Sequence, residues 1–368
     1  MTKEFNIFAL QQQAKQEYSQ VSKIFKKTFL EGNYVKGKYV EKLEKDITKY
    51  TKNKYCVTLN SGTDALMLSL WSLGIKKGDE VITSPISFIA TAASISHLGA
   101  KPVFVDVDYD LNINPNLIEK SITNKTKAIL VVHWTGRVCK MDQIQIIAKK
   151  YNLKIIEDAA QAMGSYYNET HAGNFSDVAA FSAHPLKNFN SIGDSGFITT
   201  NNYKIYKSIK NYSNHGLINR NDAELFGVNS RLDSIYAGIL SFRLKNLKKV
   251  ISKRRKNVEY YKMYLNKKFI KLPLYNPKEY HAFTIFNCFC YNRNKLFKYL
   301  NSNKIQSLIY YSKPLHLQKP SLKYGYKKGD FPIAEKLCNS ILSFPCHEFL
   351  NQKDILFISK KINQFYEK

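Results

Sequence analysis

The sequence lacks any apolar segment long enough to cross a membrane, and residues 1–4 carry no apolar signal core. A membrane-spanning helix needs about 20 consecutive apolar residues, and a secretory signal needs an apolar stretch of about 7 to 15. We therefore expect a cytoplasmic protein without a membrane partner.

Cysteine is sparse, with six residues among 368, and their spacing matches no metal-ligand motif. Cys288 and Cys290 lie in an alternating, strand-like run, so their side chains would share one face, and a disulfide or a metal site there stays open. Buried thiols are the expected alternative in a cytosolic protein. We predict no metal site.

Acidic residues are also few, 29 against 56 Lys and Arg, which gives a net charge of +27. This balance is typical of proteins that bind nucleic acids, anionic membranes or anionic small molecules. However, the lysines are spread through every segment, and only residues 253–256 form a compact basic run. On a helix, these four consecutive residues would point to different sides and would not form one basic stripe. Because no helix-turn-helix, zinc or base-stacking motif accompanies the charge, we expect no nucleic-acid partner.

Apolar residues make up 44% of the chain, enough for one large core or two domains. An amphipathic helix is expected within residues 1–30, and after it strand-like and helix-like segments alternate. The expected strands are 55–59, 80–84, 102–107, 127–132, 153–156, 178–182 and 196–200. This alternation predicts an α/β fold, in which a mostly parallel sheet is flanked by helices and ligands bind beyond the carboxyl ends of the strands.

One lysine follows the expected strand 178–182. Pro185 prevents a helix from starting there, so Lys187 falls on a loop at a strand end, before the glycine-rich turn 193–196. A lysine held between buried strands loses hydration, which lowers its pKa and leaves a free amine able to attack an aldehyde. We interpret Lys187 as a Schiff-base lysine; the alternative is a solvated loop lysine.

Two further strand ends carry polar groups. Residues 60–63 are small and precede a helix, so free backbone amides there, with the hydroxyls of Ser61 and Thr63, are able to bind an anion; the alternative is a simple N-cap. Asp158 follows the expected strand 153–156 and is suited to keep a heterocyclic ring nitrogen protonated, with Gln161 close by; the alternative is a helix cap. Together with Lys187, these groups describe a pyridoxal phosphate pocket.

The chain resembles the DegT/DnrJ/StrS family of sugar aminotransferases over nearly its whole length. The resemblance rests on an ordered set of segments, namely residues 61–63, 78–81, 157–161, 181–188, 193–196, 214–216, 229–233, 314–318, 329–335 and 342–347. It implies a type I aminotransferase fold, with a large domain of residues 1–250 that includes the N-terminal arm and a smaller C-terminal α/β domain of residues 251–368. It also implies a homodimer whose subunits share their active sites.

The resemblance also implies roles for residues around the cofactor ring. Lys187 would form the Schiff base, Asp158 would pair with the pyridinium nitrogen and Gln161 would bind the ring hydroxyl. Phe88 would stack on the ring. Without the family, Phe88 would be interpreted as a core aromatic residue.

The phosphate ligands implied by the resemblance come from two subunits. Gly62, Thr63, the Asp64 amide and Ser182 would hold the phosphate from one chain, and Asn229 would reach it from the other. Without the family, Asn229 would be interpreted as a turn residue.

Two histidines lie in matching motifs, and we predict that His184 and His316 line the sugar site, although a lone histidine is usually structural. Because relatives that perform dehydration carry histidine at the position of Lys187, the lysine implies transamination. The motifs are most similar to those of enzymes that transfer an amino group from L-glutamate to carbon 3 of a dTDP-linked 3-keto-6-deoxyhexose, in deoxyamino sugar biosynthesis for O-antigen or other polysaccharides. Amination of carbon 4, a lyase reaction and a non-catalytic regulatory role are the alternatives.

Overall fold

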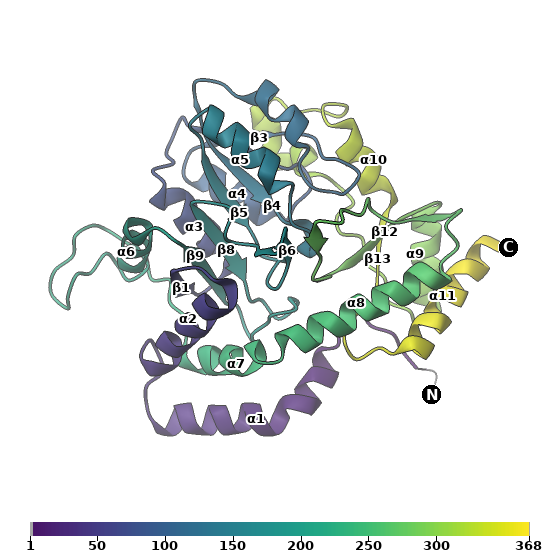
Figure 1. Ribbon diagram of the computed structural model, residues 1–368, viewed down its shortest axis with the longest axis horizontal. Helices are drawn as coiled ribbons and strands as arrows, with labels where there is room; N and C mark the ends of the chain where they lie inside the picture. The colour runs from purple at the N-terminus through teal and green to yellow at the C-terminus, as the bar shows by residue number, and fades with distance from the viewer. Residues whose placement is uncertain (1–2, 368) are drawn as a thin grey trace.

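The computed structural model describes residues 3–367, which form one seven-stranded sheet and two three-stranded sheets (Figure 1). In spatial order, the strands of the large sheet are β1 (Tyr55–Leu59), β9 (Gly196–Thr200), β8 (Val178–Ser182), β5 (Lys154–Asp158), β4 (Thr126–Val132), β2 (Glu80–Thr83) and β3 (Lys101–Phe104). β9 pairs antiparallel with both of its neighbours, and all other pairs are parallel. The predicted mostly parallel α/β sheet is confirmed.

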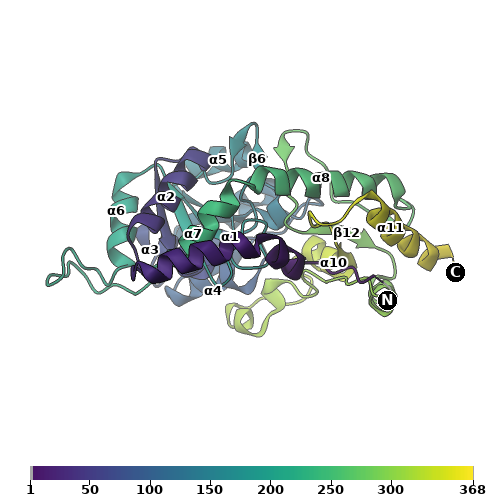
Figure 2. The ribbon, with the colours of Figure 1, turned by 90° about the horizontal axis from the view of Figure 1, so that it is seen from below.

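Helices cover both faces of this sheet. The α-helices are α1 (Leu10–Leu30), α2 (Lys38–Thr51), α3 (Gly62–Ser72), α4 (Ile89–His97), α5 (Met141–Lys150), α6 (Tyr203–Tyr212), α7 (Ser234–Leu244), α8 (Leu247–Tyr264), α9 (Arg293–Ser302), α10 (Pro332–Ser340) and α11 (Gln352–Glu367). α2, α5 and α7 share one apolar core with the sheet, whereas α3, α4 and α6 share the core on its other face. α1 packs along α7 on the underside of the molecule (Figure 2).

The central strands are apolar because both of their faces are covered. In β4, Ile129 and Val131 enter one core, while Ala128 and Leu130 enter the other. The predicted strands are therefore found, with ends that shift by a few residues. Helix α4 begins at Ile89, because Phe88 before it has an extended backbone.

The C-terminal part forms a separate apolar core around β10 (Ile270–Lys271), β12 (Phe286–Cys290) and β13 (Ile341–Phe344), covered by α8, α9 and α11. The third sheet joins β11 (Glu279–Tyr280) to β6 (Tyr166–Tyr167) and β7 (Thr170–His171), and so connects the C-terminal part to the segment between β5 and β8.

The N-terminal arm packs on the C-terminal part, whereas the prediction included it in the large domain. Phe5 belongs to the C-terminal core, and its backbone exchanges hydrogen bonds with Lys304 and Gln306. This arm therefore adds an extended segment to the C-terminal part before α1 begins.

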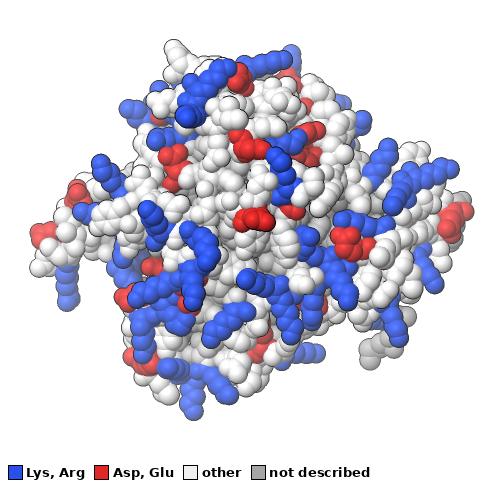
Figure 3. Space-filling view, viewed as in Figure 1, with Lys and Arg blue, Asp and Glu red and all other residues white. Residues whose placement is uncertain are grey.

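Basic side chains are spread over the face shown in Figure 3, between patches of uncharged surface. The run 253–256 is not a free basic stripe, because Arg254 is buried and ion-paired with Glu348 at 2.9 Å, and Arg255 stacks on Tyr280. All six cysteines are buried free thiols. Between residues 3 and 367, none of the helices combines the length and the apolar character needed to cross a bilayer.

Candidate active site

A pocket of ≈ 520 Å³ opens at the carboxyl ends of three parallel strands. Val132, Asp158 and Ser182 are the last residues of β4, β5 and β8, and all three line it. The first turn of α3 closes one side. The pocket therefore lies where the sequence predicts a ligand, because parallel strands bring their ends to one edge of the sheet.

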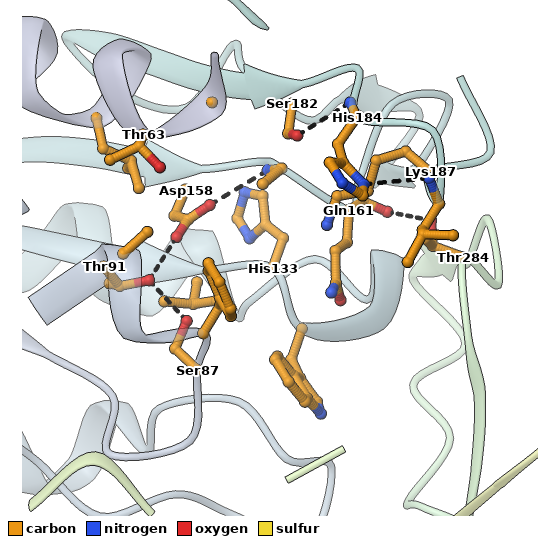
Figure 4. Close-up of a pocket in the computed structure, with 18 of the residues that line it drawn as sticks. Thr63, Ser87, Thr91, His133, Asp158, Gln161, Ser182, His184, Lys187 and Thr284 are labelled. Atoms are coloured by element: carbon orange, nitrogen blue, oxygen red, sulfur yellow. Dashed lines mark hydrogen bonds between the residues drawn. The ribbon is translucent and has the colours of Figure 1, made fainter. Parts of the chain in front are cut away.

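Lys187 lies on the loop between β8 and β9, where its backbone N–H donates to the carbonyl oxygen of His184 at 2.9 Å. Its side chain lines the pocket, on the side opposite Asp158 (Figure 4). Burial lowers the pKa of Lys187 to about 8, although the carboxylate of Asp158 opposes this shift. The unprotonated amine, which is the nucleophile, is therefore far more abundant near neutral pH than in an ordinary lysine.

Asp158 is held by two donors. The hydroxyl of Thr91 donates to Oδ2 at 2.7 Å, and the backbone N–H of Ala160 donates to Oδ1 at 3.2 Å. Ser87 lies 2.7 Å from the Thr91 hydroxyl and extends this chain of polar groups (Figure 4). Burial raises the pKa of Asp158, while Thr91 and Ala160 oppose the shift. A cationic group placed beside this carboxylate would stabilise its charged form.

The neighbouring carboxylate, Glu157, faces the opposite side of β5 and anchors the site from behind. It accepts hydrogen bonds from His133 Nε2 at 2.7 Å, from the backbone N–H groups of Gly173 and Phe175, and from the hydroxyl of Ser176. Burial acts to raise the pKa of Glu157, but these donors lower it overall. The strand end that carries Asp158 is thereby fixed to two loops.

The first turn of α3 forms an anion cradle with β8. Gly62 approaches Ser182 so closely that a Cβ on Gly62 would lie 2.7 Å from the Ser182 Cβ. The N–H groups of a first helical turn have no carbonyl partner within the helix, so those of Gly62 and Thr63 are available to an anion. The Asp64 amide was predicted to hold the phosphate, but it donates to the N-cap hydroxyl of Ser61, and Asp64 does not line the pocket.

Aromatic residues form the other wall, and only Phe88 among them was predicted. Trp134 lies 5.3 Å from Tyr311 between ring centroids, and Phe88 lies 6.2 Å from Tyr311. Trp134 follows the carboxyl end of β4, so the strand-end rule would have indicated it. Tyr311 comes from a distant segment, and no comparable sequence pattern predicts its place in the pocket.

Gln161 also lines the pocket. Its Oε1 accepts from the backbone N–H of Thr135 at 2.7 Å, and its backbone carbonyl accepts from the Thr284 hydroxyl at 2.6 Å. The side-chain amide is therefore held at the pocket with its NH₂ group free of these contacts, as a donor to a ligand oxygen.

The two predicted histidines have different positions. His184 lines the pocket, where its Nδ1 accepts from the Leu186 N–H, and burial lowers its pKa. His316 does not line the pocket, because it is fully buried and pairs with Glu335 at 3.0 Å. His316 therefore fixes the short 3₁₀ turn of residues 315–317 to Glu335 and does not line the pocket, contrary to the prediction.

The pocket thus brings eight predicted residues together, namely Gly62, Thr63, Phe88, Asp158, Gln161, Ser182, His184 and Lys187. Asn229 is absent from the lining of this chain's pocket and pairs its backbone with Asn214 on an exposed loop. The lysine, the buried carboxylate and the glycine-lined cradle fit the aldehyde, the ring nitrogen and the phosphate of pyridoxal phosphate. Among residues 3–367, no cluster of three His, Cys, Asp or Glu side chains is arranged for a metal ion.

Comparison with known proteins places this site in context. A family model described as the DegT/DnrJ/EryC1/StrS aminotransferase family matches residues 13–363. A pleiotropic regulatory protein of Geobacillus stearothermophilus is 36% identical over 362 residues, covering 97% of each chain. A dTDP-3-amino-3,6-dideoxy-alpha-D-galactopyranose transaminase of Aneurinibacillus thermoaerophilus is 36% identical over 335 residues, covering 91% of this chain and 92% of that protein. The crystal structure of S. venezuelae DesV in complex with a ketimine intermediate superposes with a TM-score of 0.97 at 31% identity, covering 100% of both chains.

Proposed function

Because the chain belongs to the DegT/DnrJ/EryC1/StrS aminotransferase family, we propose that it transfers an amino group from L-glutamate to carbon 3 of a dTDP-linked 3-keto-6-deoxyhexose. The protein has the type I aminotransferase fold and is a pyridoxal-phosphate-dependent transaminase that acts on nucleotide-linked sugars. The donor, the sugar and the carbon atom are the proposed parts.

The aromatic wall of the pocket is our reason for proposing a 6-deoxy sugar. Phe88 would stack on the cofactor ring, whereas Trp134 and Tyr311 present apolar faces to the pocket that suit the methyl group and the apolar face of a 6-deoxy sugar. A relative that is 36% identical is named for a 3-amino-3,6-dideoxy sugar, which supports carbon 3 over carbon 4.

The residues of this pocket would have different roles in the proposed reaction. When bound, pyridoxal phosphate supplies an aldehyde that captures amines and a ring that accepts electrons. Lys187 Nζ would hold the aldehyde and, once released, take a proton from the donor carbon and return it. Asp158 would keep a proton on the ring nitrogen. Gly62, Thr63 and Ser182 would bind the phosphate.

The lowered pKa of Lys187 predicts a pH dependence of cofactor loading. Only the free amine attacks the aldehyde, so the loading rate of the cofactor-free protein should rise about tenfold per pH unit below pH 8 and level off above it. The measurement is the growth of visible absorbance after mixing with pyridoxal phosphate between pH 6 and 10. A rate that still rises tenfold per unit between pH 9 and 10 would show that Lys187 has the pKa of an ordinary lysine.

A homodimer with shared active sites is part of the proposal. Large apolar side chains are exposed on α1 and on the loop 214–229, which extends away from the body beside α6 (Figures 1 and 2). They include Tyr18, Phe25, Phe29, Ile218 and Phe226. Burial of these side chains against a second copy would also bring Asn229 to the partner's cradle.

Mixed dimers test this sharing. Lys187→Ala and Asn229→Ala subunits should each be nearly inactive alone, because each removes one contribution to every site. If chains exchange at random, half of the dimers are mixed and each holds one intact site, so activity should recover to about a quarter of wild type. Mixtures that show no recovery after confirmed chain exchange would place Asn229 outside the partner's site.

Product analysis tests the sugar and the carbon atom. The protein is incubated with glutamate and either a dTDP-3-keto-6-deoxyhexose or a dTDP-4-keto-6-deoxyhexose, and the products are identified by mass spectrometry and NMR. We expect the 3-amino sugar to form at least about tenfold faster, since misplacement of a reacting atom by about 1 Å costs about 10²-fold. Faster conversion of the 4-keto sugar would show that the amino group is transferred to carbon 4 and not to carbon 3.

A regulatory role is the second candidate, because a relative of equal identity is named a pleiotropic regulatory protein. It predicts salt-dependent DNA binding without amine transfer. Amine transfer by the purified chain, with no DNA binding at physiological salt, would reject it.

A further inference from the structure

Three buried polar side chains lead from the start of α4 to the carboxylate in the active-site pocket (Figure 4). Ser87 precedes the helix, Thr91 lies in its first turn, and Asp158 ends β5. They are 5%, 1% and 5% exposed, respectively, and all three line the pocket. The hydrogen bonds among them therefore act in surroundings of low dielectric constant, where they are stronger than in water.

The hydrogens of this chain have one possible order when Asp158 is ionised. A carboxylate only accepts, so the Thr91 hydroxyl gives its single hydrogen to Oδ2 of Asp158, at 2.7 Å. Thr91 then has no hydrogen left for Ser87, whose hydroxyl lies 2.7 Å away and donates to the Thr91 oxygen. Both hydroxyls thus direct their hydrogens toward the carboxylate, and each hydrogen bond strengthens the next.

Thr91 is fixed by the first turn of α4. Its backbone N–H donates to the carbonyl oxygen of Phe88 at 3.2 Å, and its neighbours Ala90 and Ala92 are buried in the core on this face of the sheet. The same turn therefore supplies Phe88, which we propose to stack on the cofactor ring, and the hydroxyl that reaches Asp158.

The charge of Asp158 depends on its donors. Burial raises the pKa of Asp158, and the hydrogen bond from Thr91 is the strongest influence that lowers it again, ahead of the Ala160 N–H. A ring nitrogen beside this carboxylate would compete with it for one proton. Because a donor to the carboxylate stabilises the ionised form, it favours the proton on the nitrogen, and loss of the donor would move the proton toward the carboxyl oxygen.

We propose that Thr91, supported by Ser87, is a positioning residue that keeps the proton on the ring nitrogen of bound pyridoxal phosphate by holding the Asp158 carboxylate ionised. The ring nitrogen and a carboxyl oxygen share one proton, and no other group gains or loses one. The ring accepts electrons best when this nitrogen is protonated. The inference rests on the proposed pairing of Asp158 with the ring nitrogen, and it is independent of the sugar.

The test is ¹⁵N NMR of the full-length wild-type chain and two Thr91 variants, each loaded with pyridoxal phosphate that carries ¹⁵N in the ring. The chemical shift separates a protonated ring nitrogen from an unprotonated one. The wild type should show the protonated form. Thr91→Val, which keeps the shape but not the hydroxyl, should move the signal toward the unprotonated form, and Thr91→Ser should restore it. A Thr91→Val signal equal to that of the wild type would overturn the proposal.

The reaction with glutamate gives a second readout. Thr91→Val should lower its rate constant about 10- to 100-fold, because a hydrogen bond to a charged group is lost, whereas the KM for glutamate should change little. Thr91→Ser should stay within about threefold of the wild type. Ser87→Ala should cost less than Thr91→Val, since Ser87 acts only through Thr91. A larger loss for Ser87→Ala than for Thr91→Val would contradict this order.

Ser94→Ala is the matched control on the same helix. Ser94 is buried, but its hydroxyl donates to the Ala90 carbonyl oxygen at 2.7 Å, and it does not line the pocket. This variant should leave the NMR signal and the glutamate rate unchanged. A change equal to that of Thr91→Val would indicate a general loosening of α4 and reject the role of Thr91. An unprotonated nitrogen in the wild type would reject the role of Asp158 as well, whereas a protonated nitrogen in every variant would reject that of Thr91 alone.

Discussion

Replacement of Lys187 by alanine is expected to reduce amino transfer by about 10⁴-fold, the largest effect of any single substitution in this chain. The lysine has two tasks, because its amine holds the cofactor aldehyde and then moves the proton between carbon atoms. Its pKa of about 8 suits both, since the amine is free often enough to attack and still basic enough to accept a proton. The rate of product formation from glutamate and the keto sugar measures the effect.

The matched control is Lys154→Ala. Lys154 is exposed and forms an ion pair with Asp177 at 3.3 Å, away from the pocket. Such surface pairs contribute little, so this variant should retain activity within about twofold. A Lys187→Ala variant that still binds cofactor and transfers amine within tenfold of wild type would assign the chemistry to another group.

Replacement of Asp158 by asparagine should reduce amino transfer by about 10³-fold. Asparagine keeps the size of the side chain and an oxygen that accepts from Thr91, but it removes the negative charge that would keep the ring nitrogen protonated. Loss of one preorganised electrostatic contact in an active site costs about 10²- to 10³-fold. The effect should fall on the rate constant of the reaction with glutamate, whereas the absorbance of the loaded cofactor should persist.

Asp194→Asn is the control for charge in the same pocket. Asp194 lines the pocket but lies in the turn after Lys187 and not at the strand end of β5. We expect less than a tenfold loss for this variant. Equal losses for the two variants would indicate a general effect of negative charge and contradict the assignment of Asp158 to the ring nitrogen.

The strand ends explain why part of the site could be predicted from sequence. Asp158 and Ser182 end parallel strands, and Lys187 follows five residues after the second of them. Apolar runs define such strands, and parallel pairing brings their ends to one edge, so sequence positions translate directly into neighbouring side chains. Gly62 and Thr63 follow β1 in the same way.

Other parts depend on packing that sequence periodicity does not encode. Tyr311 reaches the pocket from a segment 153 residues after Asp158, whereas His316, only five residues further on, turns inward to Glu335. The arm at Phe5 crosses to the C-terminal core because its backbone finds partners at Lys304 and Gln306.

The most direct test of the central claim follows the absorbance of the wild-type protein loaded with pyridoxal phosphate through both halves of the reaction. Glutamate should convert the visible band to that of the amine form of the cofactor, with one 2-oxoglutarate released per chain, and a dTDP-linked 3-keto-6-deoxyhexose should then restore the band. If glutamate leaves the spectrum of the loaded protein unchanged, or if the keto sugar fails to restore it, this chain is not the aminotransferase that its pocket indicates.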